Sequence, residues 1–225
     1  MIPRATCRTA LVAGLVLLAG CKKEAPPPKA DKDVTGTLAD EIEVDPRLVG
    51  QPSQAAANVD LAPAQRSPAA IAAAKAEAAR LAGGPVGALP PLVEDEASHQ
   101  VIAEASARLS GGSSDCAAKV ASGKAWAQRL PRALAVYPRG HLVEAAGVDG
   151  RGCSLRVVSF VTPVGLDDVL GYYHARVRAE GLSAAQRRDG KDRVLGGTSA
   201  VRSYLIYGRT LANGLTEIDI LASGG

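Results

Sequence analysis

The chain has 225 residues, a length that allows one domain with additional segments or two small domains. Hydrophobic residues make up 47% of the sequence and aromatic residues only 3%; because alanine buries little area, this composition excludes a large, aromatic-rich core. The net charge of +3 is divided unevenly, since residues 21–115 are acidic and residues 116–225 are basic. This division bears on the partners of the protein rather than on its fold.

The first 20 residues have the pattern of an export signal. Arg4 and Arg8 precede an apolar run of about 12 residues that ends in small side chains. A helix needs roughly 20 apolar residues to span a bilayer. The run therefore favours a cleaved leader over a transmembrane anchor.

The leader ends in Leu18-Ala19-Gly20-Cys21, which resembles the lipobox of bacterial lipoproteins. The resemblance covers residues 1–21 and implies cleavage before Cys21, then acylation of its sulfur and usually of its new amino group. Several acyl chains, at about 0.8 kcal/mol per buried CH₂, anchor a protein stably to a membrane. By the same resemblance, Lys22 favours the outer membrane over the inner one. We therefore expect a lipid-anchored protein of the cell envelope that faces the periplasm.

Two segments precede the main folded region. Residues 21–66 are rich in proline and charge, which predicts a disordered tether. Residues 67–114 are alanine-rich and predict two helices, over 67–84 and 94–109. The first helix has Ser67 as N-cap and glycines at its end, and its few large apolar side chains predict that it is exposed or forms only on docking.

Residues 115–225 are predicted to form one compact domain, because most large apolar side chains lie there. Its first predicted elements are a helix over 116–130, a strand over 133–138 and two strands over 141–148 and 153–161. The segment between the last two strands is rich in Asp and Gly, which is typical of the turn of an antiparallel hairpin.

The clearest helix is predicted over 166–180, where one face carries Leu166, Val169, Leu170, Tyr173 and Val177 at helical spacing. Tyr172 and His174 flank this face and are expected at the edge of the sheet or in solvent. A short hairpin over 183–195 follows. Asn213-Gly214 then predicts the turn of a last hairpin.

A two-residue loop at Asn213-Gly214 also predicts the register of the last hairpin. It pairs Ala212 with Leu215 and places Leu205, Tyr207, Ile218 and Ile220 on one face. Glu217 and Asp219 fall on the other face, together with Tyr204 and Ile206. The fold class that follows is α+β: a small antiparallel sheet of four to six strands with helices packed on one face.

Cys116 and Cys153 are the cysteines that remain for the mature protein besides Cys21. Export reaches an oxidising compartment, so we expect a disulfide between them, worth roughly 4 kcal/mol in the chain-entropy model. A redox or metal role is the alternative, but the sequence has no CxxC motif and no clustered histidines. No cofactor and no metal site are predicted.

Catalytic motifs are absent from the sequence, so an enzyme would need a site built from distant residues. Asp167, Asp168 and His174 are the candidates for a hydrolase site. Carboxylates in the first turn of a helix are also expected simply because they interact favourably with the helix dipole.

Arginine is frequent from the long helix onward, and its guanidinium binds phosphate and carboxylate well. The residues predicted as a polyanion site are Arg176, Arg178, Arg187, Arg188, Arg193 and Arg202. In an envelope compartment the anions would be lipid phosphates or peptidoglycan carboxylates, and nucleic acid would not be a partner. The alternative is a solvated basic surface, or one that docks onto the protein's own acidic segment.

The sequence therefore favours a membrane-anchored lipoprotein that presents a non-catalytic binding or accessory domain to an envelope polyanion or a protein partner. One alternative is the envelope hydrolase described above. Another is a structural spacer that assembles through the alanine-rich helices of residues 67–110.

Overall fold

The fold was derived from a computed structural model, which describes residues 53–92, 94–110, 116, 119–150 and 152–224. The chain divides into Met1–Asp40 and Glu41–Gly225, and all described residues belong to the second unit. The predicted leader, the lipobox with Cys21 and residues 21–52 of the predicted tether lie outside the described residues.

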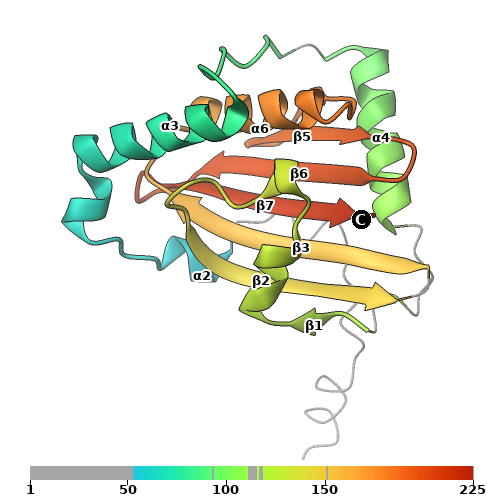
Figure 1. Cartoon of the computed structure of the whole chain (residues 1–225), viewed down its shortest axis with the longest axis horizontal. Coiled ribbons are helices and arrows are strands. Elements are labelled where there is room, and N and C mark those ends of the chain that lie inside the picture. The colour runs from blue at the N-terminus through green and yellow to red at the C-terminus, as the bar shows by residue number, and fades with distance from the viewer. Residues whose placement is uncertain (1–52, 93, 111–115, 117–118, 151, 225) are drawn as a thin grey trace, which may run out of the picture. The chain divides into compact units, whose positions relative to one another are not determined.

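The described part of the chain is built on a seven-stranded sheet with the order β1-β2-β3-β7-β6-β5-β4, in which all neighbours are antiparallel (Figure 1). This arrangement confirms the α+β class and its antiparallel sheet, with seven strands where four to six were expected. The strands are β1 (Ala121–Ser122), β2 (His141–Gly150), β3 (Cys153–Thr162), β4 (Ala185–Asp189), β5 (Asp192–Thr198), β6 (Ser203–Thr210) and β7 (Thr216–Ser223).

Helices cover both faces of the sheet. The α-helices are α2 (Gln54–Ala57), α3 (Pro68–Ala82), α4 (Glu96–Ser110) and α6 (Leu166–Ala179), and the 3-10 helices are η1 (Pro63–Arg66), η2 (Lys124–Arg129) and η3 (Arg132–Leu134). Helix α6 packs on one face and is itself covered by α3 and η3. Helix α4 packs on the opposite face, against β4 to β7 (Figure 1). The second face was not expected to carry a helix.

The predicted core face of α6 is confirmed, because Val169, Leu170, Tyr173 and Val177 are buried against the sheet. Tyr172 is buried as well, contrary to the expectation. Its ring lies 5.1 Å from that of Tyr137 in an edge-to-face contact, under the outer layer made by α3 and η3. A second helical layer outside α6 cannot be inferred from the periodicity of α6 alone.

The alanine-rich helix α3 has the predicted caps: Ser67 accepts a hydrogen bond from the backbone of Ala70, and Gly83 is left-handed with φ of 84°. It is not freely exposed, since Ala74 and Ala78 are buried in the same core cluster as α6. The segment interpreted as a helical linker therefore packs onto the folded domain, α3 against α6 through its small side chains and α4 against the sheet through Ile102.

The described end of the predicted tether is also ordered. Residues 53–66 contain α2 and η1, and Ala56 and Leu61 are buried in a small cluster with Val161 and Leu215. The prediction of disorder was wrong for these residues. Although the segment is mostly polar, its few apolar side chains are buried against apolar residues of the sheet and of the last hairpin.

The predicted continuous helix over 116–130 was wrong, because Ala121–Ser122 form β1 and Lys124–Arg129 form a 3-10 helix. The predicted strand over 133–138 was wrong too, because Arg132–Leu134 form η3 and no strand follows before β2 in the described chain. β1 pairs Ala121 with Gly147 of β2, and the Gly123 amide donates to the Ala145 carbonyl, 2.8 Å away. Trp126, on η2, fills the space above Gly147, where a Cβ would lie 2.6 Å from the indole. The pairing of β1 with β2 and the packing of Trp126 against Gly147 are tertiary interactions, and they override the local helix propensity.

The first hairpin confirms the prediction. Gly150 pairs with Cys153, and Gly152 takes the left-handed backbone conformation with φ of 72° that a tight turn requires. The short hairpin β4–β5 is likewise present, with Asp189 paired to Asp192.

The last hairpin forms at the predicted turn, but its register differs by one residue. Thr210 pairs with Thr216, so the loop is longer than the two residues of the simplest Asn-Gly turn. Within it, the Leu211 amide donates to the Leu215 carbonyl at 2.8 Å. A shift of one residue reverses the face of one strand relative to its partner.

The observed register separates apolar from charged side chains better than the predicted one. The face toward α6 receives Tyr204, Ile206, Ile218 and Ile220. Charged side chains gather instead on the opposite face, which contains Arg209, Glu217 and Asp219. The free energy gained by burying a purely apolar face of the sheet under α6 explains the one-residue shift in register.

Candidate functional site: an arginine-lined cavity

A cavity of about 610 Å³ lies at the end of the sheet where β7 finishes, and arginines form much of its wall. It is lined by Arg129, Pro131, Arg156, Val201, Arg202 and Gly224. Strand pairing brings these distant residues together, because Ser223 of β7 pairs with Leu155 of β3 on one side and with Ser203 of β6 on the other.

Arg156 is the most deeply placed cation of the cavity, with a side chain only 9% exposed. One of its terminal nitrogens donates to Asp149 at 2.6 Å, and the other donates to the hydroxyl of Ser154. Among the described residues, its Nε has no hydrogen-bond partner. Arg156 is thus a buried cation whose donors are not all used.

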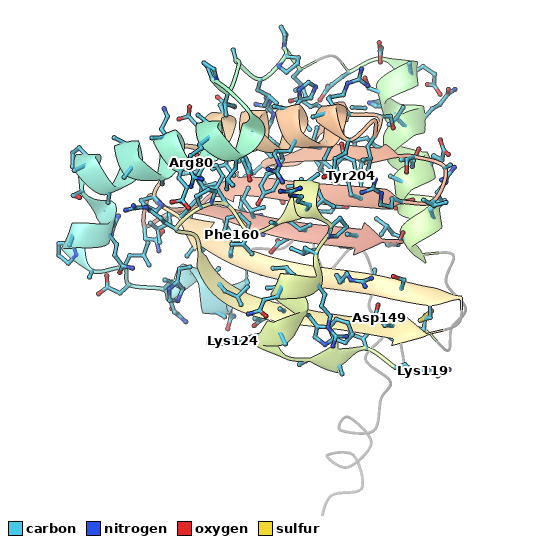
Figure 2. The ribbon with its side chains drawn as sticks, viewed as in Figure 1. Arg80, Lys119, Lys124, Asp149, Phe160 and Tyr204 are labelled. Atoms are coloured by element: carbon cyan, nitrogen blue, oxygen red, sulfur yellow. A yellow bond between two sulfur atoms is a disulfide. The ribbon has the colours of Figure 1, made fainter. Side chains whose placement is uncertain are left out.

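Asp149 is shared between two of the arginines. Its second oxygen accepts from Arg129 at 3.1 Å, and Arg129 in turn lies over the ring of Trp126 at 4.8 Å. Figure 2 shows Asp149 on β2, close to the β2–β3 turn. One carboxylate therefore serves two guanidinium groups, and this side of the cavity keeps an excess of positive charge.

The opposite wall carries Arg202 and the apolar side chain of Val201. Arg202 pairs with Glu180 at 2.7 Å and retains partial exposure. Val201 is 76% exposed, the larger of the two exposed fractions found for large apolar side chains in the described chain. The cavity thus combines cationic walls with an apolar rim.

The disulfide lies next to this end of the sheet. Cys116 and Cys153 are bonded with their Cα atoms 5.6 Å apart, which confirms the predicted pairing. Cys153 starts β3 directly opposite Gly150 and is one residue away from Ser154, the partner of Arg156. The covalent link holds the turn that positions Asp149.

The six arginines predicted as a polyanion site do not form one cluster. Arg202 lines the cavity, while Arg176 donates to the carbonyls of Leu81 and Arg132 and so ties α6 to its outer layer. Arg193 pairs with Asp167 at 3.1 Å.

The remaining predicted arginines lie away from the cavity wall. Arg187 pairs with Asp189 at 3.2 Å, and Arg178 and Arg188 are exposed on α6 and β4. Sequence reasoning missed Arg129 and Arg156, because they precede the arginine-rich part of the chain and only strand pairing brings them to Arg202.

The three residues proposed for a hydrolase are occupied by other interactions or lie apart from the cavity. Asp168 forms an ion pair with Lys75 at 2.9 Å, and Asp167 pairs with Arg193. His174 is half-buried, and burial, followed by the charge of Arg178, lowers its pKa below the usual value. None of the three lines the arginine cavity.

A second group of charges lies buried on the face of the sheet opposite α6. Arg209 of β6 contacts the carboxylates of Asp192, Glu217 and Asp219 at 2.9, 2.9 and 3.0 Å. Glu217 also accepts from the backbone amide of Ser53 at 3.1 Å, which connects the cluster to the N-terminal side of α2. The sequence feature that indicates this cluster is the placement of charged residues at alternate positions of an otherwise apolar strand, as in Glu217 and Asp219 of β7.

Burial raises the pKa of Asp219 to about 7, with nearby Glu217 acting in the same direction and Arg209 opposing it. A carboxyl whose pKa is higher in the folded state than in the unfolded chain stabilises the fold at low pH. Below about pH 4 this contribution is complete, and it is lost as the pH rises through about 7.

We therefore expect Asp219→Asn to remove part of the pH dependence of stability. The difference in unfolding free energy between the wild type and the variant should fall from pH 5 to pH 7, by at most about 1.4 kcal/mol per pH unit. Urea unfolding of both proteins at several pH values measures it. A difference that is constant over this range would show that Asp219 titrates normally.

Comparison of the chain with protein-family models, with curated proteins and with solved structures found no match. Within the described residues, no helix has the length and apolar character needed to cross a membrane. The same residues contain no group of three or more His, Cys, Asp or Glu side chains arranged to hold a metal ion.

Proposed function

We propose that this protein is an acyl-anchored lipoprotein of the cell envelope whose folded domain binds an anionic ligand in the cavity formed by Arg129, Arg156 and Arg202. The observation that carries the proposal is the sharing of Asp149 by two arginines, which leaves positive charge on the wall of a cavity of about 610 Å³.

The chemistry of the cavity favours a ligand with a phosphate or carboxylate group. Guanidinium groups donate paired hydrogen bonds to planar oxyanions, and partly buried guanidinium groups do so with less screening by water. The volume lies within the range of small-molecule sites, roughly 300–1,000 Å³. In an envelope, lipid headgroup phosphates and peptidoglycan carboxylates offer such groups.

The anchor rests on the resemblance of residues 18–21 to a lipobox and on the short apolar leader before it. Cys21 would carry the acyl chains, the membrane would be the first partner, and the domain would face the periplasm from the outer membrane. Labelling of cells with radioactive palmitate tests this part. The wild-type chain should incorporate label and Cys21→Ala should not; an unlabelled wild type would contradict the anchor.

The cavity proposal predicts that Arg129→Gln and Arg202→Gln weaken binding of inorganic pyrophosphate by about tenfold each, since each loses one charged hydrogen-bond donor. Isothermal titration calorimetry of the chain from Lys22 onward, which lacks both the apolar leader and the acylated cysteine, measures the affinity without detergent. Wild-type affinity should also fall as salt is added.

Arg188→Gln is the matched control, because Arg188 is exposed on β4 and outside the cavity. It should leave the affinity unchanged. If Arg188→Gln weakens binding as much as the cavity variants do, the ligand is held by dispersed surface charge. If pyrophosphate does not bind saturably and citrate, as a carboxylate probe, does not either, the proposal is wrong.

The two alternatives have weaker support. The acidic side chains of the hydrolase hypothesis, Asp167 and Asp168, each pair with a cation. Assembly through residues 67–110 would need apolar faces that α3 and α4 already use against this protein's own sheet and α6.

A further inference from the structure

A second cavity, of about 310 Å³, lies beneath the N-terminal half of α3. It is lined by Leu61, Ala64, Gln65, Ala70, Ala74, Arg139, Thr162 and Pro163. These residues come from the segment before α3, from α3 itself, from the turn before β2 and from the end of β3. Its lining shares no residue with that of the arginine cavity.

The cavity is left open because the side chains of α3 that face the end of β3 are small. Ala70 and Ala74 present only methyl groups to it, and Leu61 and Pro163 complete a mostly apolar wall. The polar side chain of Thr162 already accepts a hydrogen bond from the amide of Val164, at 3.3 Å. The interior therefore suits an apolar group of modest size, at the lower end of small-molecule sites.

Arg139 supplies the only formal charge among the residues that line this cavity. Its side chain is 57% exposed and its nearest carboxylate is that of Glu77, 3.6 Å away, a distance too long for a strong ion pair. Glu77 is shared with Arg80, at 3.9 Å. The guanidinium of Arg139 therefore forms only a weak ion pair with Glu77 and can also contact a ligand.

The backbone of Arg139 is unusual as well. It has φ of 61°, the single positive value among non-glycine residues of the described chain. A glycine would adopt this conformation without the cost that a side chain imposes. Strained residues of this kind concentrate at binding sites, where the surrounding structure holds them in place.

We propose that this cavity binds a small amphipathic carboxylate, such as a medium-chain fatty acid, with its apolar tail between α3 and Pro163 and its carboxylate on Arg139. The apolar wall provides burial for the tail, and the single cation at its edge fixes the orientation of the head. An alcohol of the same chain length has the tail but not the charge, and should bind more weakly.

Titration calorimetry with sodium octanoate on the chain from Lys22 onward tests the proposal, with octan-1-ol as the neutral probe. Ala70→Leu should weaken octanoate binding markedly, because the larger side chain occupies part of the cavity beside the tail. Ala72→Leu makes the same change at an exposed position of the same helix and should leave binding intact.

Arg139→Gln should weaken octanoate binding by about tenfold without affecting octan-1-ol. Arg80→Gln is its control, since Arg80 also lies beside Glu77 but does not line the cavity. Circular dichroism of each variant confirms that it is folded. Absence of saturable octanoate binding, or binding that Ala70→Leu and Arg139→Gln do not reduce, would overturn the proposal.

Discussion

Replacing Arg209 by methionine is expected to lower the free energy of unfolding by about 3–5 kcal/mol. The guanidinium is 4% exposed and contacts three carboxylates, of which Glu217 is completely buried. Without it, the desolvated carboxylates of Asp192, Glu217 and Asp219 face one another with no counter-charge from Arg209. They must either repel or take up protons.

Urea unfolding at pH 7, followed by far-UV circular dichroism, measures this loss. Arg188→Met on the edge strand β4 is the control, because the side chain there is exposed and the substitution should change stability by less than about 0.5 kcal/mol. The Arg209→Met variant should recover part of its stability at pH 5, where Asp219 is protonated because burial raises its pKa to about 7. A loss below 1 kcal/mol would mean that the cluster contributes little to the fold.

Removing the disulfide by the double substitution Cys116→Ser and Cys153→Ser is expected to lower the unfolding free energy by about 4 kcal/mol. The bond closes a loop with a sequence separation of 37 residues, which includes η2, η3 and β2. The effect arises mainly from the greater conformational freedom of the unfolded chain.

The wild type unfolded in the presence of reductant should show a loss similar to that of the double variant. Mass spectrometry of the exported protein without reductant should find both thiols oxidised. Two free thiols, or equal stability of the oxidised and reduced proteins, would contradict a structural disulfide.

Local patterns predicted the elements that are stabilised by local interactions. Helix α6 follows from its apolar spacing, α3 from Ser67 and Gly83, and the β2–β3 hairpin from the turn at Gly152. In each case the residues that cap, turn or bury the element lie within it or next to it. These elements can therefore be predicted from a short stretch of sequence.

The errors occur where distant partners decide the structure. The chain around Trp126 forms a short 3-10 helix rather than part of a long α-helix, because β2 offers hydrogen-bond partners and Gly147 leaves room for the indole. The last hairpin has a shifted register because α6 covers Ile206 and Ile218. The sequence around Trp126 does not indicate that β2 will pair with it, and the sequence of the last hairpin does not indicate that α6 will cover it.

The same reason explains which part of the candidate site could be predicted. Arg202 was among the predicted arginines, but Arg129 and Arg156 join it only through the pairing of β7 with β3 and β6. Arg139 has no distinctive sequence context, and its importance appears only from its backbone conformation and its place at a cavity.

NMR of the ¹⁵N-labelled chain from Lys22 onward, which lacks the leader and the acylated cysteine, shows directly whether an anion binds at the end of the sheet. Backbone and arginine side-chain resonances are followed while pyrophosphate is added. If the anion binds in the arginine cavity, the largest shifts occur at Arg129, Arg156, Val201 and Arg202 and reach saturation together. Shifts that spread over Arg178, Arg187 and Arg188 while the cavity residues stay unchanged would contradict it.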